Sequence, residues 1–150
     1  MKPKYLYHGS GREIKGNLIP KKAFDLDKTK NNTMKGIYAS SHKEEAIAMG
    51  ILKCKGVKGS SVHMGRNNGI INMDAVIYGG WPKQKYIYLY TLSSETFENR
   101  PKGSPQWVSS ESVKPKKVEK LLVKDYIHLI RKATKKEKEK WVKEYGDKLK

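Results

Sequence analysis

Three short segments carry side chains that could hold a polar ligand, and they lie far apart in the chain. His8 stands in the first of them, YLYHGS, Tyr38 stands in KGIYAS, and Gln106 begins QWVS. An imidazole and a carboxamide exchange hydrogen bonds with hydroxyl groups, and a tyrosine ring offers a flat face for stacking. Each residue taken alone also has a structural explanation, because a sheet packs such side chains and pairs their polar tips without any ligand.

The elements that must position these residues are mostly strands. Strands are predicted from the alternation of side chains at 4–8, 35–40, 71–80, 85–92, 106–113 and the first half of 117–132. Segments with glycine, serine or unpatterned polar residues are predicted as loops, at 9–17, 21–34, 53–69 and 93–105. Both patterns favour a sheet whose strands are joined by long connections.

Two helices are predicted from their capping residues. Ser41 and Glu44 form a capping box that begins the first helix, and Gly50 ends it. Thr134 and Glu137 give the same signal for a charged helix that continues nearly to the end of the chain. Because strands outnumber helices and 150 residues suit one domain, we expect a single α+β domain over the whole chain.

In this order the segments resemble the ADP-ribosyltransferase superfamily, whose members with a His–Tyr–Glu type triad bind NAD in a split β-sheet fold. The chain is most similar to the small rifamycin-modifying ADP-ribosyltransferases. The similarity lies in the opening YHG, the GNLIP turn, the strand and helix of IYASSHKEEA, and YIYLYTLSSETFE. It covers about residues 4–50 and 85–125. It implies split antiparallel sheets with few helices. It also implies an NAD-dependent mono-ADP-ribosyltransferase that transfers ADP-ribose to a macromolecular or small-molecule acceptor and releases nicotinamide.

The resemblance also implies a role for each matching residue. His8 would hydrogen-bond a ribose hydroxyl, Tyr38 would stack on the cationic nicotinamide ring, and Gln106 would take the third position of the triad. Gly9 has no Cβ to keep its backbone away from the carboxamide of NAD. The residues implied to bind NAD, which is the substrate, are His8, Gly9, Ser10, Tyr38 and Ser40.

The third position departs from the family pattern, because Gln106 carries no charge. Cleavage of the nicotinamide–ribose bond builds an oxocarbenium-like cation, which a carboxylate stabilises more than an amide does. Glu98 and Glu111 are nearby carboxylates, but an odd offset from Gln106 places Glu111 on the opposite face of a flat strand. We therefore expect Gln106 to act with His8 and Tyr38 as the catalytic set.

The charge of the chain points to an anionic partner. It carries 32 lysine and arginine residues against 15 acidic ones, a formal net charge of +17. Such a charge attracts NAD and favours nucleic acid or an acidic protein surface as the acceptor, although a lysine-biased composition explains it equally well. Arginine, which reads bases and grips phosphates in two-pronged contacts, occurs only at positions 12, 66, 100 and 131.

Other classes of site are disfavoured by the sequence. His42 and His63 have no partners at metal-ligand spacing, so no metal is expected, and the single Cys54 excludes an internal disulfide. With no apolar run long enough to span a membrane, we expect a cytoplasmic protein. Two alternatives to the transferase stay open: an NAD-dependent RNA 2′-phosphotransferase, and a basic nucleic-acid-binding module without catalysis.

Overall fold

The computed structural model describes residues 2–22, 35–68 and 70–146 of the chain. The strands are β1 (Tyr5–Ser10), β2 (Lys21–Lys22), β3 (Lys35–Ser40), β4 (Val57–Asn67), β5 (Ile70–Gly80), β6 (Tyr86–Ser93), β7 (Phe97–Asn99), β8 (Gln106–Ser109), β9 (Lys117–Leu122) and β10 (Ile130–Lys132). The helices are α1 (Lys43–Leu52), α2 (Val123–Tyr126) and α3 (Lys135–Tyr145), with a 3₁₀ turn at Ile127–Leu129.

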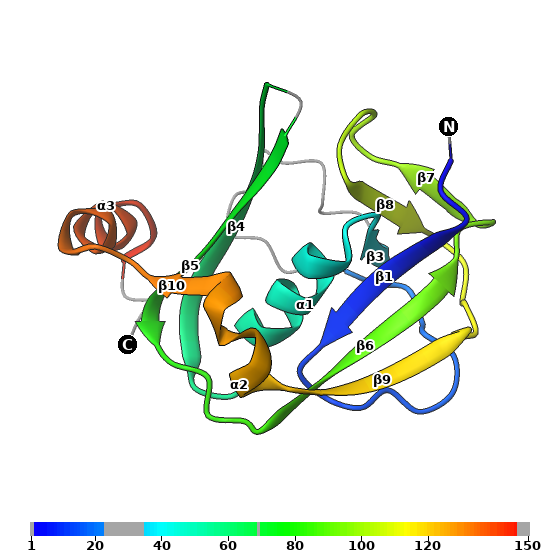
Figure 1. The fold of residues 1–150 in the computed structure, drawn as a ribbon, viewed down its shortest axis with the longest axis horizontal. Coiled ribbons are helices and arrows are strands. Elements are labelled where there is room, and N and C mark those ends of the chain that lie inside the picture. The colour runs from blue at the N-terminus through cyan, green and yellow to red at the C-terminus, as the bar shows by residue number, and fades with distance from the viewer. Residues whose placement is uncertain (1, 23–34, 69, 147–150) are drawn as a thin grey trace.

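The larger sheet contains every strand that carries a candidate residue. Its order is β7-β8-β3-β1-β6-β9, with β2 also paired to β3, and its pairings are antiparallel. β1 therefore lies in the middle, between β3 and β6, and β8 lies on the far side of β3 (Figure 1). The first strand of the chain is thus hydrogen-bonded to β6, which begins about eighty residues later, and only β3 separates it from β8.

The smaller sheet, in the order β10-β5-β4, is built on a long antiparallel hairpin, with β10 running parallel to β5. α3 is attached to this hairpin by aromatic stacking and by charge. The ring of Trp141 stacks on Tyr78 with centroids 4.2 Å apart. Arg131 on β10 donates to Asp74 on β5 at 2.9 Å and to Glu137 on α3 at 2.8 Å. These contacts join the C-terminal helix to the rest of the domain.

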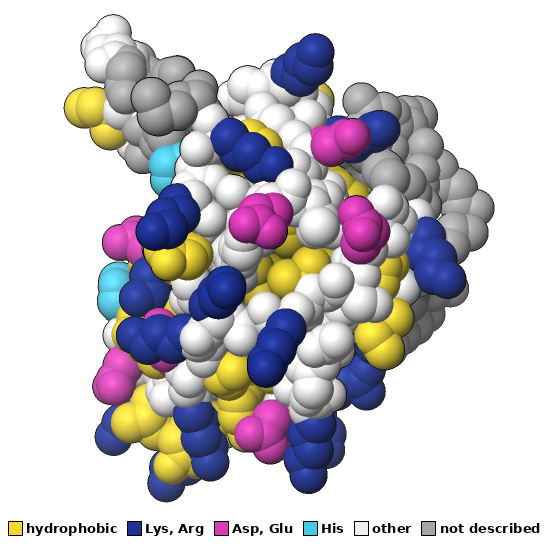
Figure 2. All heavy atoms as spheres, turned by 90° about the vertical axis from the view of Figure 1, so that its right-hand side faces the viewer, with side chains coloured by type: hydrophobic (Ala, Val, Ile, Leu, Met, Phe, Trp, Pro, Cys, Tyr) yellow, Lys and Arg dark blue, Asp and Glu magenta, His cyan; other side chains and the backbone are white. Residues whose placement is uncertain are grey.

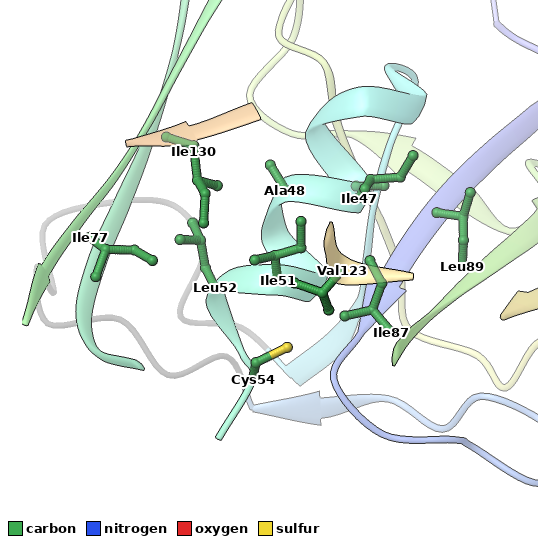
Figure 3. Close-up of a cluster of buried hydrophobic side chains, with 12 residues drawn as sticks. Ile47, Ala48, Ile51, Leu52, Cys54, Ile77, Ile87, Leu89, Val123 and Ile130 are labelled. Atoms are coloured by element: carbon green, nitrogen blue, oxygen red, sulfur yellow. The ribbon is translucent and has the colours of Figure 1, made fainter. Parts of the chain in front are cut away.

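α1 lies between the two sheets and supplies the middle of the main core (Figure 1). Apolar side chains from the helix and from both sheets meet there, including Ile47, Ile51, Leu52, Ile77, Ile87 and Leu89 (Figure 3). Each buried aliphatic side chain of this kind contributes about 1.5–3 kcal/mol relative to an exposed one. The helix thereby holds the two sheets at a fixed separation.

A second apolar cluster contains Leu6 of β1 with Tyr90 and Leu92 of β6. The segment after β1 packs on it, because Leu18 is buried in the same cluster and pairs with Val113. The Tyr90 hydroxyl accepts a hydrogen bond from the Ile14 amide at 2.5 Å. This segment is therefore anchored by a fully buried tyrosine of the central strands.

The α+β class is confirmed, with mostly antiparallel sheets and with strands where β1, β3, β5, β6, β8 and β9 were predicted. The capping box of Thr134 and Glu137 is also confirmed, with both of its hydrogen bonds formed at the start of α3. The loop predicted at 21–34 lies outside the described residues apart from Lys21–Lys22. The agreement is best where side-chain alternation or a capping box is strong.

Two predictions about the first helix are wrong. Its N-cap is His42, which forms no side-chain cap, and not Ser41 with Glu44. Instead the hydroxyl of Ser40, the last residue of β3, accepts a hydrogen bond from the His42 amide at 2.9 Å. Gly50 does not end the helix but lies within it. A glycine suits this position because it faces β1, where a Cβ would stand 3.2 Å from the Ser10 nitrogen.

The loop predicted at 53–69 is also wrong, because β4 occupies most of it. The strand pairs with β5 from Val57–Gly80 to Asn67–Ile70. Its glycines and serines have little intrinsic preference for a strand, so the long partner strand decides the conformation. A shorter strand, β7, likewise lies in the loop predicted at 93–105 and pairs with β8.

Gly9 gives the sharpest test of the packing of β1 against α1. A Cβ at Gly9 would lie 1.8 Å from the carbonyl oxygen of Ala46 on α1. We expect Gly9→Ala to lower the free energy of unfolding by about 1–3 kcal/mol or more, because helix and strand must separate. Gly65→Ala is the matched control, since its Cβ meets nothing within 4 Å, and should change stability by less than about 0.5 kcal/mol. Equal urea midpoints for both variants would contradict this account.

Candidate functional site

The junction between β1 and β3 is unlike the other junctions of the larger sheet. β1 pairs with β6 from Tyr5–Ser93 to Ser10–Tyr88, whereas its register with β3 consists of the pair Tyr7–Ser40. The sheet is thus divided into β7-β8-β3 on one side and β1-β6-β9 on the other. Beyond the single pair, a side chain joins the two halves.

That side chain is His8. Its Nδ1 lies 2.7 Å from the backbone carbonyl oxygen of Tyr38. A carbonyl can only accept, so Nδ1 carries the proton and donates it, which leaves Nε2 of the neutral ring as a hydrogen-bond acceptor. The contact joins His8 to the backbone of Tyr38 and not to its ring. The imidazole therefore stands at the division of the sheet with a defined tautomer.

The surroundings of His8 keep it neutral. The pKa of His8 is lowered from 6.5 to about 4, chiefly by burial and next by the nearby charge of Lys53; the hydrogen bond to the Tyr38 carbonyl opposes this in part, and Lys21 adds a smaller lowering effect. The ring of Tyr90 lies beside it, with centroids 6.4 Å apart. The site thus combines an uncharged acceptor with two cationic neighbours, an arrangement that suits an anionic ligand with hydroxyl groups.

Tyr38, Ser40 and Gln106 are brought together by the pairing of β3 with β8. Ser40 is directly opposite Gln106, and Tyr38 lies two positions along the same strand, so all three start from one face. His8 is opposite Tyr90 on β6 and starts from the other face of its own strand. The structure therefore groups the candidates in two sets that meet at the β1–β3 junction.

Ser40 forms a contact that the sequence did not reveal. Its hydroxyl donates to the carboxylate of Glu45 on the first turn of α1, at 2.5 Å. Since Ser40 is opposite Gln106, Ser40 links this carboxylate to the third candidate position. The spacing of Ser40 and Glu45, from a strand end to the first turn of the helix, could have indicated the pair had the start of the helix been predicted correctly.

The two other carboxylates considered from the sequence are placed differently. Glu98 forms an exposed ion pair with Arg100 at 3.3 Å. Glu111 lies beyond the end of β8 and is exposed. The Gln106 side chain itself donates to the backbone carbonyl of Arg100 at 2.9 Å, in the connection between β7 and β8. In the described structure, its amide nitrogen is therefore turned toward that connection.

Gly9 and Ser10 have structural roles in addition to those implied for them. Gly9 packs directly on the backbone of α1. The Ser10 hydroxyl donates to the Arg12 carbonyl at 2.7 Å and accepts from the Arg12 amide at 3.2 Å, which closes a tight turn after β1. The turn ends β1 two residues after His8.

Positive charge is spread over the surface rather than gathered at the junction alone. Figure 2 shows lysine and arginine side chains distributed over one face, with apolar and fewer acidic side chains between them. Within the described residues, no three histidine, cysteine or acidic side chains are grouped to hold a metal ion. None of the helices in that part of the chain is long and apolar enough to cross a membrane.

Comparisons with family models, with curated proteins and with solved structures found no match. The candidate site is therefore defined by its own geometry: a neutral imidazole at a divided sheet, a tyrosine on the facing strand, and a carboxylate held by Ser40 beside Gln106. Chemically, this set can orient hydroxyl groups, stack on a flat ring and stabilise a positive charge.

The lowered pKa of His8 predicts a dependence of stability on pH. The folded state holds His8 neutral down to about pH 4, while the unfolded chain protonates it below about 6.5. Its contribution is therefore complete above pH 6.5 and is lost as the pH falls toward 4, by about 3 kcal/mol. His8→Asn keeps a donor for the Tyr38 carbonyl without titrating. The difference in unfolding free energy between the two proteins should shrink over this range; a constant difference would contradict the assignment.

Proposed function

We propose that the chain is an NAD-dependent mono-ADP-ribosyltransferase with its NAD site at the junction of β1 and β3. The observation that carries this proposal is the position of His8, whose imidazole bridges the divided sheet to Tyr38 and keeps Nε2 as an acceptor. The proposal extends the α+β class to the split-sheet type of this superfamily. It is supported by the division between two groups of three strands.

NAD brings chemistry that these residue types suit. Its pyrophosphate is attracted by Lys21 and Lys53, the cations that act on His8. Nε2 of His8 accepts a hydrogen bond from a ribose hydroxyl and so fixes the sugar. The Tyr38 ring stacks on the flat, cationic nicotinamide. Because His8 and Tyr38 start from opposite faces of their strands, NAD would contact both of them at the division between β1 and β3.

The reaction breaks the bond between the anomeric carbon of the ribose and the nicotinamide nitrogen. The bonding electrons leave with nicotinamide, and the sugar becomes an oxocarbenium-like cation. A nucleophile of the acceptor then bonds to the anomeric carbon and gives up its proton. A protein site accelerates this step by orienting the ribose and by placing negative charge near the developing cation.

Glu45 is our candidate for that negative charge. Gln106 is neutral, and because its amide nitrogen donates to the Arg100 carbonyl, it would orient the ribose through its amide oxygen. The Glu45 carboxylate, held by the Ser40 hydroxyl at 2.5 Å, lies on the first turn of α1. A carboxylate in this position stabilises the cation electrostatically and accepts the proton of the acceptor. Ser40 then acts as a positioning residue for Glu45.

Ligand binding is the first test. NAD at about one hundred times its dissociation constant should stabilise the folded protein by about 2.7 kcal/mol, read as a rise in melting temperature. His8→Ala should remove most of this rise, because it deletes the acceptor for the ribose hydroxyl. His63→Ala, which removes an exposed histidine of β4, should keep it. An unchanged melting temperature at millimolar NAD would refute the dinucleotide site.

Nicotinamide release tests the catalytic roles separately from binding. Glu45→Gln and Gln106→Ala should each lower the rate by about 10- to 1000-fold with a smaller effect on KM for NAD, because each acts mainly on the transition state. Gln106→Glu should preserve or raise the rate, since it adds a charge opposite the cation. Glu44→Gln is the matched control, on the same helix turn but exposed. Full activity in Gln106→Ala or Glu45→Gln would exclude that residue from the mechanism.

A further inference from the structure

A second feature of the molecule lies away from His8, around a hollow of about 310 Å³. It opens between the connection that joins β5 to β6 and the turn from β9 into α2. Trp81 and Lys85 line one side, and Leu122, Lys124 and Ile127 line the other. The hollow thus has an apolar lining with lysines on both of its sides.

Aromatic rings and lysines are paired around this hollow. The Lys132 ammonium lies 5.0 Å from the ring centre of Trp81. Tyr86, which is opposite Leu122 in the sheet, has Lys120 at 4.2 Å and Lys85 at 5.5 Å from its ring centre. Two aromatic faces are therefore each accompanied by exposed positive charge.

The charge of this region is strongly one-sided. The segments 81–86 and 120–127 contain one acidic residue, Asp125, against four lysines. None of the basic residues in these two segments is an arginine. Lysine supplies point charges that attract phosphates without the two-pronged geometry that reads guanine, so the region suits a backbone and not a base sequence.

We propose that this surface binds single-stranded nucleic acid with little sequence preference. The bases stack on Trp81 and Tyr86, and the phosphates lie along the lysines. An acidic peptide would satisfy the lysines but would leave the aromatic rings unused, whereas stacked bases and phosphates use both. The lysine-and-aromatic surface is defined by Trp81, Lys85, Tyr86, Lys120, Lys124 and Lys132.

The surface is connected to the end of β1. Gln84, between Trp81 and Tyr86, donates its side-chain amide to the Gly11 carbonyl at 2.5 Å, three residues after His8. A nucleic acid bound to this surface would therefore lie near the loop that follows β1. If the proposed transferase activity holds, this makes the bound nucleic acid a candidate acceptor. The binding itself does not depend on NAD.

Fluorescence anisotropy with a labelled oligothymidylate of about 15 nucleotides, without NAD, tests the surface directly. With four lysines in contact, the logarithm of the association constant should fall with the logarithm of salt at a slope of about −3, and Lys85→Ala/Lys124→Ala should reduce it to about −1.4. Lys102→Ala/Lys114→Ala, two exposed lysines in other connections, should keep the wild-type slope.

Tyr86→Leu tests the stacking separately from the charge. It should weaken binding about tenfold while leaving the salt slope unchanged, because it removes a ring and no charge. Circular dichroism and melting temperature establish that each variant is folded. Unchanged binding by Tyr86→Leu, equal slopes for both lysine variants, or competition by polyglutamate as effective as by unlabelled oligothymidylate would each overturn the proposal. Because NAD is absent, none of these outcomes bears on the transferase.

Discussion

The close approach of β1 to α1 is the constraint on which the rest of the structure depends. Gly9 packs against the backbone of Ala46, and Gly50 packs in return against Ser10, so neither position has room for a side chain of ordinary size. This contact allows the helix to lie between the two sheets and to fill the main core. It also fixes the course of the central strand at His8, so the candidate site depends on the same packing.

The burial of His8 at the β1–β3 junction is the main reason for its lowered pKa. His8 cannot be solvated in a way that favours its charged form, and its lysine neighbours oppose protonation further, so the ring stays neutral and keeps one acceptor nitrogen. The lysines that give the chain its high net charge occur in two different settings. The charges of Lys21 and Lys53 act on a neutral imidazole, whereas the lysines near Trp81 and Tyr86 face solvent beside aromatic rings. The first arrangement suits a small anion with hydroxyl groups, and the second suits a longer polyanion.

Much of the fold could be predicted from local patterns, and the failures have a common cause. The alternation in β6 and the capping box of α3 are signals contained in a few consecutive residues, and both are confirmed. β4 has no such signal, because glycine and serine form a strand there only by pairing with β5. Gly50 looks like a helix end in sequence, but the neighbouring strand requires a glycine at that point of the helix. In each case a partner distant in sequence overrides the local preference.

By itself, the sequence determined the types of the candidate residues and the strands that carry them: His8 on β1, Tyr38 on β3 and Gln106 at the start of β8. Only the tertiary structure decided their relations. It placed the imidazole on the Tyr38 carbonyl, turned the Gln106 amide toward Arg100, and brought Glu45 to Ser40. The physical reason is that strand alternation is a property of one segment, whereas the division of the sheet and the start of a helix depend on how separate segments pack. The type of each side chain can be read from one segment of the sequence, whereas the distances between side chains depend on the packing of several segments.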